Sequence, residues 1–235
     1  MSHRTVATLT LLCVAQIVAN ALWFSADEGV QFTDAAYHYS QTIDLRNAVL
    51  EGSEGVTALR QEDERQRYGS LGYLVAASLS LVTGPEASDL LLGLSILLWP
   101  LLLFGAFQLG SLLAPAADAE RSGLLSAAFV GLIPGVFNYS RVLVLDLGLT
   151  AAVLWTIVLL LRLHQAMKRG APTKRLLWLL GLSGGAALSL KVNAVAFILG
   201  PSLALFWPKL REAWDSDRRR GAGWRSPPRA AWRLQ

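Results

Sequence analysis

The sequence predicts an all-α membrane protein, a polytopic helical bundle that crosses the bilayer about six times. Two observations carry this fold class. Hydrophobic residues make up 53% of the chain and charged residues only 16%, and the mean hydropathy of +0.42 is far above that of an average soluble domain. Uncharged runs also recur along the chain, and several approach the roughly 20 residues that a helix needs to cross the hydrocarbon core.

The predicted spans divide into a first helix near the amino terminus and five that follow a long polar segment. They are residues 5–25, 88–113, 122–138, 147–164, 175–190 and 192–208. The first run has an alternative interpretation as a cleavable signal sequence, with a short basic start at 2–4 and a small-residue pattern at 19–21. Both interpretations place the following segment outside. The single cysteine, Cys13, excludes a disulfide within the chain.

Charges are segregated along the chain, and this segregation predicts the orientation. Residues 26–68 hold nine acidic and four basic side chains, whereas the link from Arg162 to Arg175 has five basic side chains and no acidic one. The segment from Lys209 onward has eight basic and three acidic side chains. Because Lys and Arg accumulate in cytoplasmic flanks, the link and the tail are expected inside and the acidic segment outside. We therefore divide the chain into a membrane module, 1–208, with a first outer loop at 26–87, and a disordered basic tail, 209–235.

Residues 69–83 are apolar but short, about 15 residues, and they decide the topology. If they crossed the membrane, the basic link and the basic tail would both lie outside. We expect instead an interfacial or re-entrant helix that belongs to the first outer loop. Asp34, Asp146 and Lys191 then all lie at the outer membrane face.

The first candidate site is the cluster Asp34, Tyr37 and His38 in the outer loop. On a helix these residues are spaced i, i+3, i+4 and share one face. A carboxylate beside an imidazole and a phenol can accept a proton or hold a cation. An amphipathic interfacial helix with no catalytic role is the alternative, since aromatic residues collect at membrane interfaces.

The second and third candidates are charged residues at the ends of apolar spans. Arg141 and Asp146 precede a span of Leu, Val and Ala, and Lys191 separates two apolar runs at the turn of a helical hairpin. Asp146 either caps its helix or serves a substrate. Lys191 either extends to the interface or binds a phosphate or acidic group. The pattern leaves both pairs of alternatives open.

Other chemistries find little support in the sequence. No pair of His, Cys or carboxylate residues has zinc-site spacing, and no glycine-rich loop of the nucleotide-binding type is present. The Arg-rich tail is basic enough to suggest nucleic acid, but a cytoplasmic flank that meets anionic lipid explains it better. We expect the lipid bilayer, and no nucleic acid, as a partner.

The order of these motifs resembles the N-terminal half of the GT-C membrane glycosyltransferases, especially bacterial members related to protein O-mannosyltransferases and the lipid A aminoarabinose transferase. The similarity covers about residues 5–208. The motifs are a first span, an outer-loop helix with Asp34-x-x-Tyr37-His38, the segment Tyr68-Gly69-Ser70-Leu71-Gly72-Tyr73, Ser140-Arg141 followed by Asp146, and a glycine-rich span that ends in Lys191.

The resemblance implies a membrane enzyme that moves a sugar from a polyprenyl-phosphate-linked donor to a lipid, glycan or protein acceptor. It implies an integral protein of the bacterial inner membrane with its active face outward. Asp34 and Asp146 correspond to the catalytic acids of the family, and either is a candidate contact for a divalent cation such as Mg²⁺ or Mn²⁺. Lys191 corresponds to a substrate-binding basic residue, and we infer the same phosphate contact for Arg141.

Tyr37 and His38 complete the expected substrate-binding set of the first outer loop. The family commonly has Asp-Glu in this loop, whereas Ala35 follows Asp34 here, so the earlier pair Asp27-Glu28 is a rival assignment. Family members also have more spans than this chain, so a missing C-terminal half is expected. A truncated, non-catalytic membrane protein and a transporter fragment are the alternative functions.

Overall fold

The computed structural model describes residues 1–26, 33–52, 70–141, 146–191 and 193–219. All the regular elements in these ranges are α-helices, as the composition predicted. They are α1 (His3–Ala26), α2 (Thr33–Glu51), α4 (Ser70–Thr83), α5 (Ala87–Leu113), α6 (Ala119–Leu132), α7 (Pro134–Tyr139), α8 (Asp146–Lys168), α9 (Lys174–Leu190) and α10 (Ala194–Arg219).

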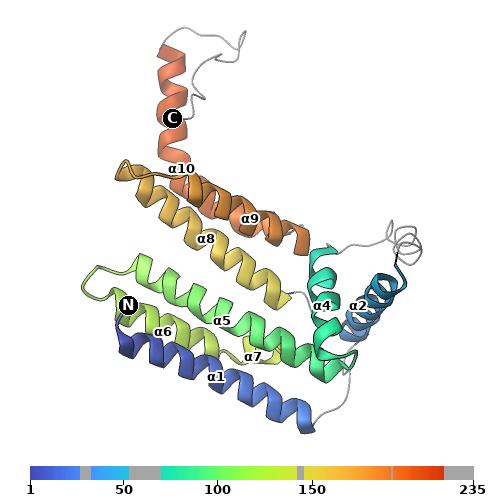
Figure 1. Cartoon of the computed structure of the whole chain (residues 1–235). Coiled ribbons are helices and arrows are strands. Elements are labelled where there is room, and N and C mark those ends of the chain that lie inside the picture. Colours follow the sequence, from blue (N-terminus) through green and yellow to red (C-terminus); the bar gives the residue numbers. More distant parts are fainter. Residues whose placement is uncertain (27–32, 53–69, 142–145, 192, 220–235) are drawn as a thin grey trace.

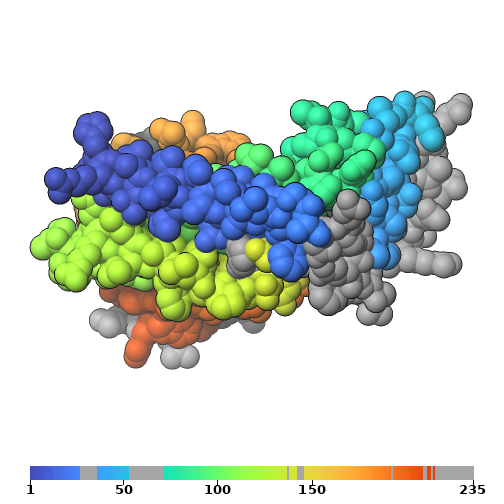
Figure 2. All heavy atoms as spheres, turned by 90° about the horizontal axis from the view of Figure 1, so that it is seen from below, coloured from blue at the N-terminus to red at the C-terminus, as the bar shows by residue number. Residues whose placement is uncertain are grey.

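The long helices form two layers (Figure 1). One layer holds α1, α5 and α6, and the other holds α8, α9 and the first part of α10; contacts between α5 and α8 join them. From below, α1 and α6 lie side by side along one face, and α2 and α4 project at one end (Figure 2). The architecture is therefore a helical bundle with a small helical cap at one end.

Three of the described helices, α1, α5 and α8, are long and apolar enough to cross a membrane by length and composition. Two further apolar stretches, Leu71–Thr83 and Ala194–Pro208, are shorter. The composition and these helices identify an integral membrane protein. The other expected spans correspond to α6, α9 and α10, which pack in the same bundle.

Two helices differ from those expected, and a proline explains the first difference. Residues 122–138 do not form one helix, because α6 ends and Pro134 begins α7. Ile133, between them, has the extended conformation that a following proline imposes, φ −66° and ψ 119°. The last helix, α10, contains Pro201 and Pro208 and continues beyond the expected boundary at 208 to Arg219, and its final part points away from the bundle (Figure 1). Residues 220–235 lie outside the described residues.

The core is centred on α5. Trp99, Leu102 and Leu103 are almost completely buried and pack against Leu147 and Ala151 of α8. Toward α6, Gly110 of α5 and Gly123 of α6 let the two helices approach closely, because a Cβ atom on either glycine would lie within 3 Å of the other helix.

Consecutive long helices alternate in direction, so the bundle has two distinct ends (Figure 1). One end holds the end of α1, the beginnings of α5 and α8 and the end of α9, together with α2 and α4. The other end holds the amino terminus and the basic link between α8 and α9. Helix α4 contacts α2, α5 and α9 and runs across the ends of the last two.

Candidate functional site

An ion pair joins two of the predicted site residues. Lys191 Nζ lies 2.9 Å from Asp146 Oδ1, although 45 residues separate them in the chain. Asp146 is the first residue of α8, and Lys191 directly follows α9 with an extended backbone. An acid at a helix start and a base at a helix end both interact favourably with the helix dipoles. The antiparallel packing of α8 and α9 therefore brings these complementary charges to the same end.

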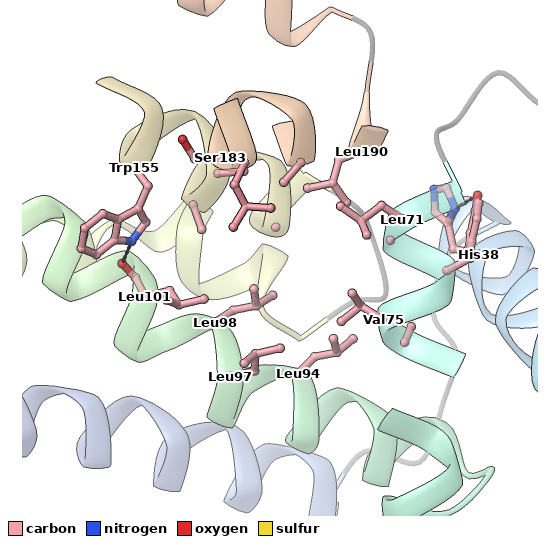
Figure 3. Close-up of a pocket in the computed structure, with 18 of the residues that line it drawn as sticks. His38, Leu71, Val75, Leu94, Leu97, Leu98, Leu101, Trp155, Ser183 and Leu190 are labelled. Atoms are coloured by element: carbon pink, nitrogen blue, oxygen red, sulfur yellow. Dashed lines mark hydrogen bonds between the residues drawn. The ribbon is translucent and has the colours of Figure 1, made fainter. Parts of the chain in front are cut away.

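An apolar cavity of about 580 Å³ lies between α4, α5, α8 and α9. One wall is a row of α5 leucines that includes Leu94, Leu97, Leu98 and Leu101, and Trp155 lies at one end (Figure 3). Leu190 lies at the opposite end, with Leu71 and His38 beyond it.

The ion pair is positioned at this second end of the cavity. Leu190 and Gly148 both line the cavity. Leu190 directly precedes Lys191, and Gly148 follows two residues after Asp146. The arrangement is thus an apolar chamber with a charged pair next to one of its ends.

His38 adds a polar group to the lining. Its side chain is only 4% exposed, and its Nδ1 lies 2.7 Å from the hydroxyl oxygen of Tyr73 on α4. The sequence pattern placed Tyr37 on the same face, but Tyr37 is 42% exposed and does not line the cavity; its ring packs edge-on against His38. Tyr73 was not among the predicted site residues, and an aromatic residue in the short apolar helix is the signal that could have found it.

Arg141 lies at the same end of the bundle, in the short link that follows α7. Its Nε donates to Oδ1 of Asn20 at 3.4 Å, and its guanidinium carbon lies 4.2 Å from the ring centroid of Trp23. Partial burial lowers the pKa of Arg141 from its ordinary value. Neither Asn20 nor Trp23 was among the site residues predicted from the sequence. The signal for Asn20 is an amide in an otherwise apolar span.

The first-loop acids are only partly covered by the structure. Asp34 belongs to the first turn of α2, one helical turn before His38. Its side chain and the whole rival pair Asp27-Glu28 lie outside the described residues. The roles predicted for these three acids therefore stay predictions.

The described side chains do not by themselves fit a divalent cation. Among the residues that the structure covers, no three His, Cys, Asp or Glu side chains come close enough to hold a metal. The carboxylate of Asp146 is paired with an ammonium group, which neutralises the charge that a metal would need. The metal expected from the resemblance stays a prediction.

One comparison with known proteins found a match. The family model for dolichyl-phosphate-mannose-protein mannosyltransferase matches residues 87–224, more than half of the chain. The match begins at α5 and therefore includes Arg141, Asp146 and Lys191. Comparison with curated proteins and with solved structures found no significant match. The family match confirms the resemblance to GT-C enzymes that the order of motifs indicated. The chain belongs to the dolichyl-phosphate-mannose-protein mannosyltransferase family of membrane glycosyltransferases.

Proposed function

We propose that this chain transfers a sugar from a polyprenyl-phosphate-linked donor to a lipid, glycan or protein hydroxyl at the outer face of the bacterial inner membrane. The observation that carries the proposal is the apolar cavity whose one end adjoins the Asp146–Lys191 pair. The family description names mannose, so mannose is the first sugar to test.

The cavity suits an isoprenoid chain. Its volume of about 580 Å³ is that of a small-molecule site, and its lining is mostly aliphatic. Leu97 and Leu101 line the cavity and are 44% and 41% exposed, so the wall is open toward the lipid side. A chain dissolved in the bilayer therefore enters without passing through water.

The charged end suits the phosphate of the donor. Lys191 and Arg141 are cations near the site end of the bundle, and charge-assisted hydrogen bonds from such groups hold phosphate strongly. The phosphate competes with Asp146 for Lys191. Donor binding then releases the Asp146 carboxylate next to the reacting sugar.

The reaction is a substitution at the anomeric carbon of the sugar. Asp34 removes the proton from the acceptor hydroxyl, and the acceptor oxygen forms a bond to the anomeric carbon. The bond between that carbon and the phosphate oxygen breaks, and polyprenyl phosphate leaves with one more negative charge. Arg141 and Lys191 stabilise that charge as it develops.

Charge distribution supports the outward orientation. The site end of the bundle adjoins the acidic first loop, and the basic link between α8 and α9 lies at the opposite end. A transporter fragment needs ionisable residues in the middle of the bilayer. Asp146 and Lys191 instead lie at helix termini, which favours the transferase.

A substitution in the cavity tests donor binding. Leu97→Trp fills the cavity, whereas Ile96→Trp, at an adjacent residue that is 54% exposed and outside the lining, is the matched control. We expect Leu97→Trp to weaken binding of farnesyl phosphate and Ile96→Trp to leave it unchanged. Equal affinities for the two variants would show that the isoprenoid does not bind here.

Catalysis and topology have separate tests. Asp34→Asn should abolish sugar transfer while membrane insertion and donor binding persist, and retained turnover would remove Asp34 from the mechanism. A non-catalytic protein would bind donor and transfer nothing in any variant.

Single cysteines in place of Asp34, Asp146 and Lys191, in a Cys13→Ser background, should all react with an impermeant thiol reagent from the outside. Labelling from opposite sides contradicts the proposed topology.

A further inference from the structure

The end of α1 contributes a buried polar cluster at the same end of the bundle as the Asp146–Lys191 pair. Asn20 is completely buried, and its amide nitrogen donates to Ser95 Oγ of α5 at 3.0 Å and to Ser140 Oγ after α7 at 2.9 Å. Its carbonyl oxygen accepts from Ser140 Oγ and from Nε of Arg141, each at 3.4 Å. One side chain thus connects three helical segments and the cation assigned to the donor phosphate.

Burying polar groups costs free energy unless they are hydrogen-bonded, so each partner of Asn20 needs a reason. The Asn20 amide and the two serine hydroxyl groups are enough to link the helices through hydrogen bonds. The additional contact with Arg141 is not needed to link helices. Trp23, three residues after Asn20 and on the same face of α1, holds the same guanidinium from another direction.

The two α1 residues constrain different parts of the guanidinium. Asn20 engages Nε on one edge, and the central guanidinium carbon lies over the Trp23 ring, 4.2 Å from its centroid. A hydrogen bond at Nε and a contact at the central carbon together restrict the rotation of the guanidinium, and with it the direction of the two terminal nitrogens. Those nitrogens form the fork that binds a phosphate through two parallel hydrogen bonds.

We propose that Asn20 and Trp23 are positioning residues that hold the Arg141 guanidinium in the orientation in which it binds the donor phosphate. The inference rests on the proposed phosphate contact of Arg141. It assigns to α1, which lies outside the region matched by the family model, a part in donor recognition. Rigid prior orientation of a binding group raises affinity because less freedom is lost on binding.

Trp23 gives the sharper test because it is 39% exposed, so we expect its replacement to leave the fold intact. The full-length protein is reconstituted in nanodiscs, and binding of farnesyl phosphate is compared with binding of farnesol, which lacks the phosphate. We expect Trp23→Leu to weaken farnesyl phosphate binding about three- to tenfold and to leave farnesol binding unchanged. Trp23→Phe should restore most of the affinity because a phenyl ring keeps the π face.

The matched control is Leu22→Ala, at a neighbouring α1 residue that is 67% exposed. It should change neither affinity. Asn20→Leu keeps the side-chain size and removes the acceptor for Arg141; it should reproduce the selective loss for the phosphate ligand. A loss that is equal for both ligands in the Trp23 and Asn20 variants would show a merely structural role and overturn the proposal.

A double-mutant cycle separates this inference from the function on which it rests. If Arg141→Gln leaves farnesyl phosphate binding unchanged, the phosphate contact itself fails. If Arg141→Gln weakens binding, Trp23→Leu should add nothing further in that background, because the group it positions is gone. Independent, additive losses would refute positioning while leaving the phosphate contact of Arg141 intact.

Discussion

The pairing of Asp146 with Lys191 makes a prediction in which stability and function respond differently to the same substitutions. The variants are Asp146→Asn, Lys191→Met and the double substitution. At 2.9 Å the Coulomb attraction between two unit charges in bulk water is about 1.4 kcal/mol. The side chains of Lys191 and Asp146 are 27% and 45% exposed, and ordering them costs entropy. We therefore expect the pair to contribute only about 0.5–1 kcal/mol to the free energy of unfolding.

The two single substitutions should change the affinity for farnesyl phosphate more than they change the free energy of unfolding. The two changes in affinity should have opposite signs. Lys191→Met removes a charge-assisted hydrogen bond to phosphate, worth about 1.5–3 kcal/mol, which weakens farnesyl phosphate binding roughly tenfold to a hundredfold. Asp146→Asn removes the carboxylate that competes with the phosphate for Lys191, so binding should become tighter. Sugar transfer by Asp146→Asn should nevertheless fall by at least about a hundredfold, because the carboxylate released next to the reacting sugar is lost.

Two measurements check these expectations on the same preparations. Thermal unfolding followed by tryptophan fluorescence gives the coupling energy of the double-mutant cycle, and titration with farnesyl phosphate gives the affinities. If Asp146→Asn weakens phosphate binding as Lys191→Met does, the pair acts as a structural unit. The proposed exchange of partners during donor binding would then be wrong.

Two further predictions concern packing and pH. A Cβ atom on Gly123 of α6 would lie 2.7 Å from the ring of Phe107, so Gly123→Ala should destabilise the protein by about 1–3 kcal/mol; Gly181→Ala, with open space around the residue, should not destabilise it. Equal unfolding midpoints for the two variants would contradict close α5–α6 packing. Hydrogen bonds from the Ser2 backbone and the Thr5 hydroxyl lower the pKa of Glu120 from 4.5 to about 2, so its stabilising contribution is complete above pH 4.5 and is lost as the pH falls toward 2. Glu120→Gln should flatten this part of the pH dependence of unfolding, and an unchanged profile would show that the hydrogen bonds from Ser2 and Thr5 to Glu120 do not stabilise the protein.

The predicted and observed helices agree where their formation depends on residues that are close together in the sequence. Hydrophobic run length predicted α1, α5 and α8, because the burial of apolar side chains in lipid depends on composition over about 20 residues. The break at Pro134 is also local: proline favours an extended preceding residue, and a stricter use of that preference would have divided 122–138. The order of the charged motifs sufficed to indicate the family.

Periodicity on one helix could not decide which residues of the first loop face the cavity. The i, i+3, i+4 pattern grouped Tyr37 with His38, yet only His38 points into the space between α2 and α4. Periodicity shows which residues share a helix face, but it does not show which face is buried. The element that packs against the helix decides that. Here that element is α4, whose Tyr73 hydroxyl lies beside the imidazole.

The sequence by itself determined that this protein is a membrane-embedded helical bundle of the mannosyltransferase family, because hydropathy, charge segregation and motif order are properties of the chain. Only the tertiary structure decided that Asp146 and Lys191 form an ion pair at the end of an apolar cavity, and that Asn20 and Trp23 hold Arg141. These contacts join residues far apart in the sequence. Their existence depends on the direction, register and tilt of packed helices, which arise from the whole bundle rather than from any single segment.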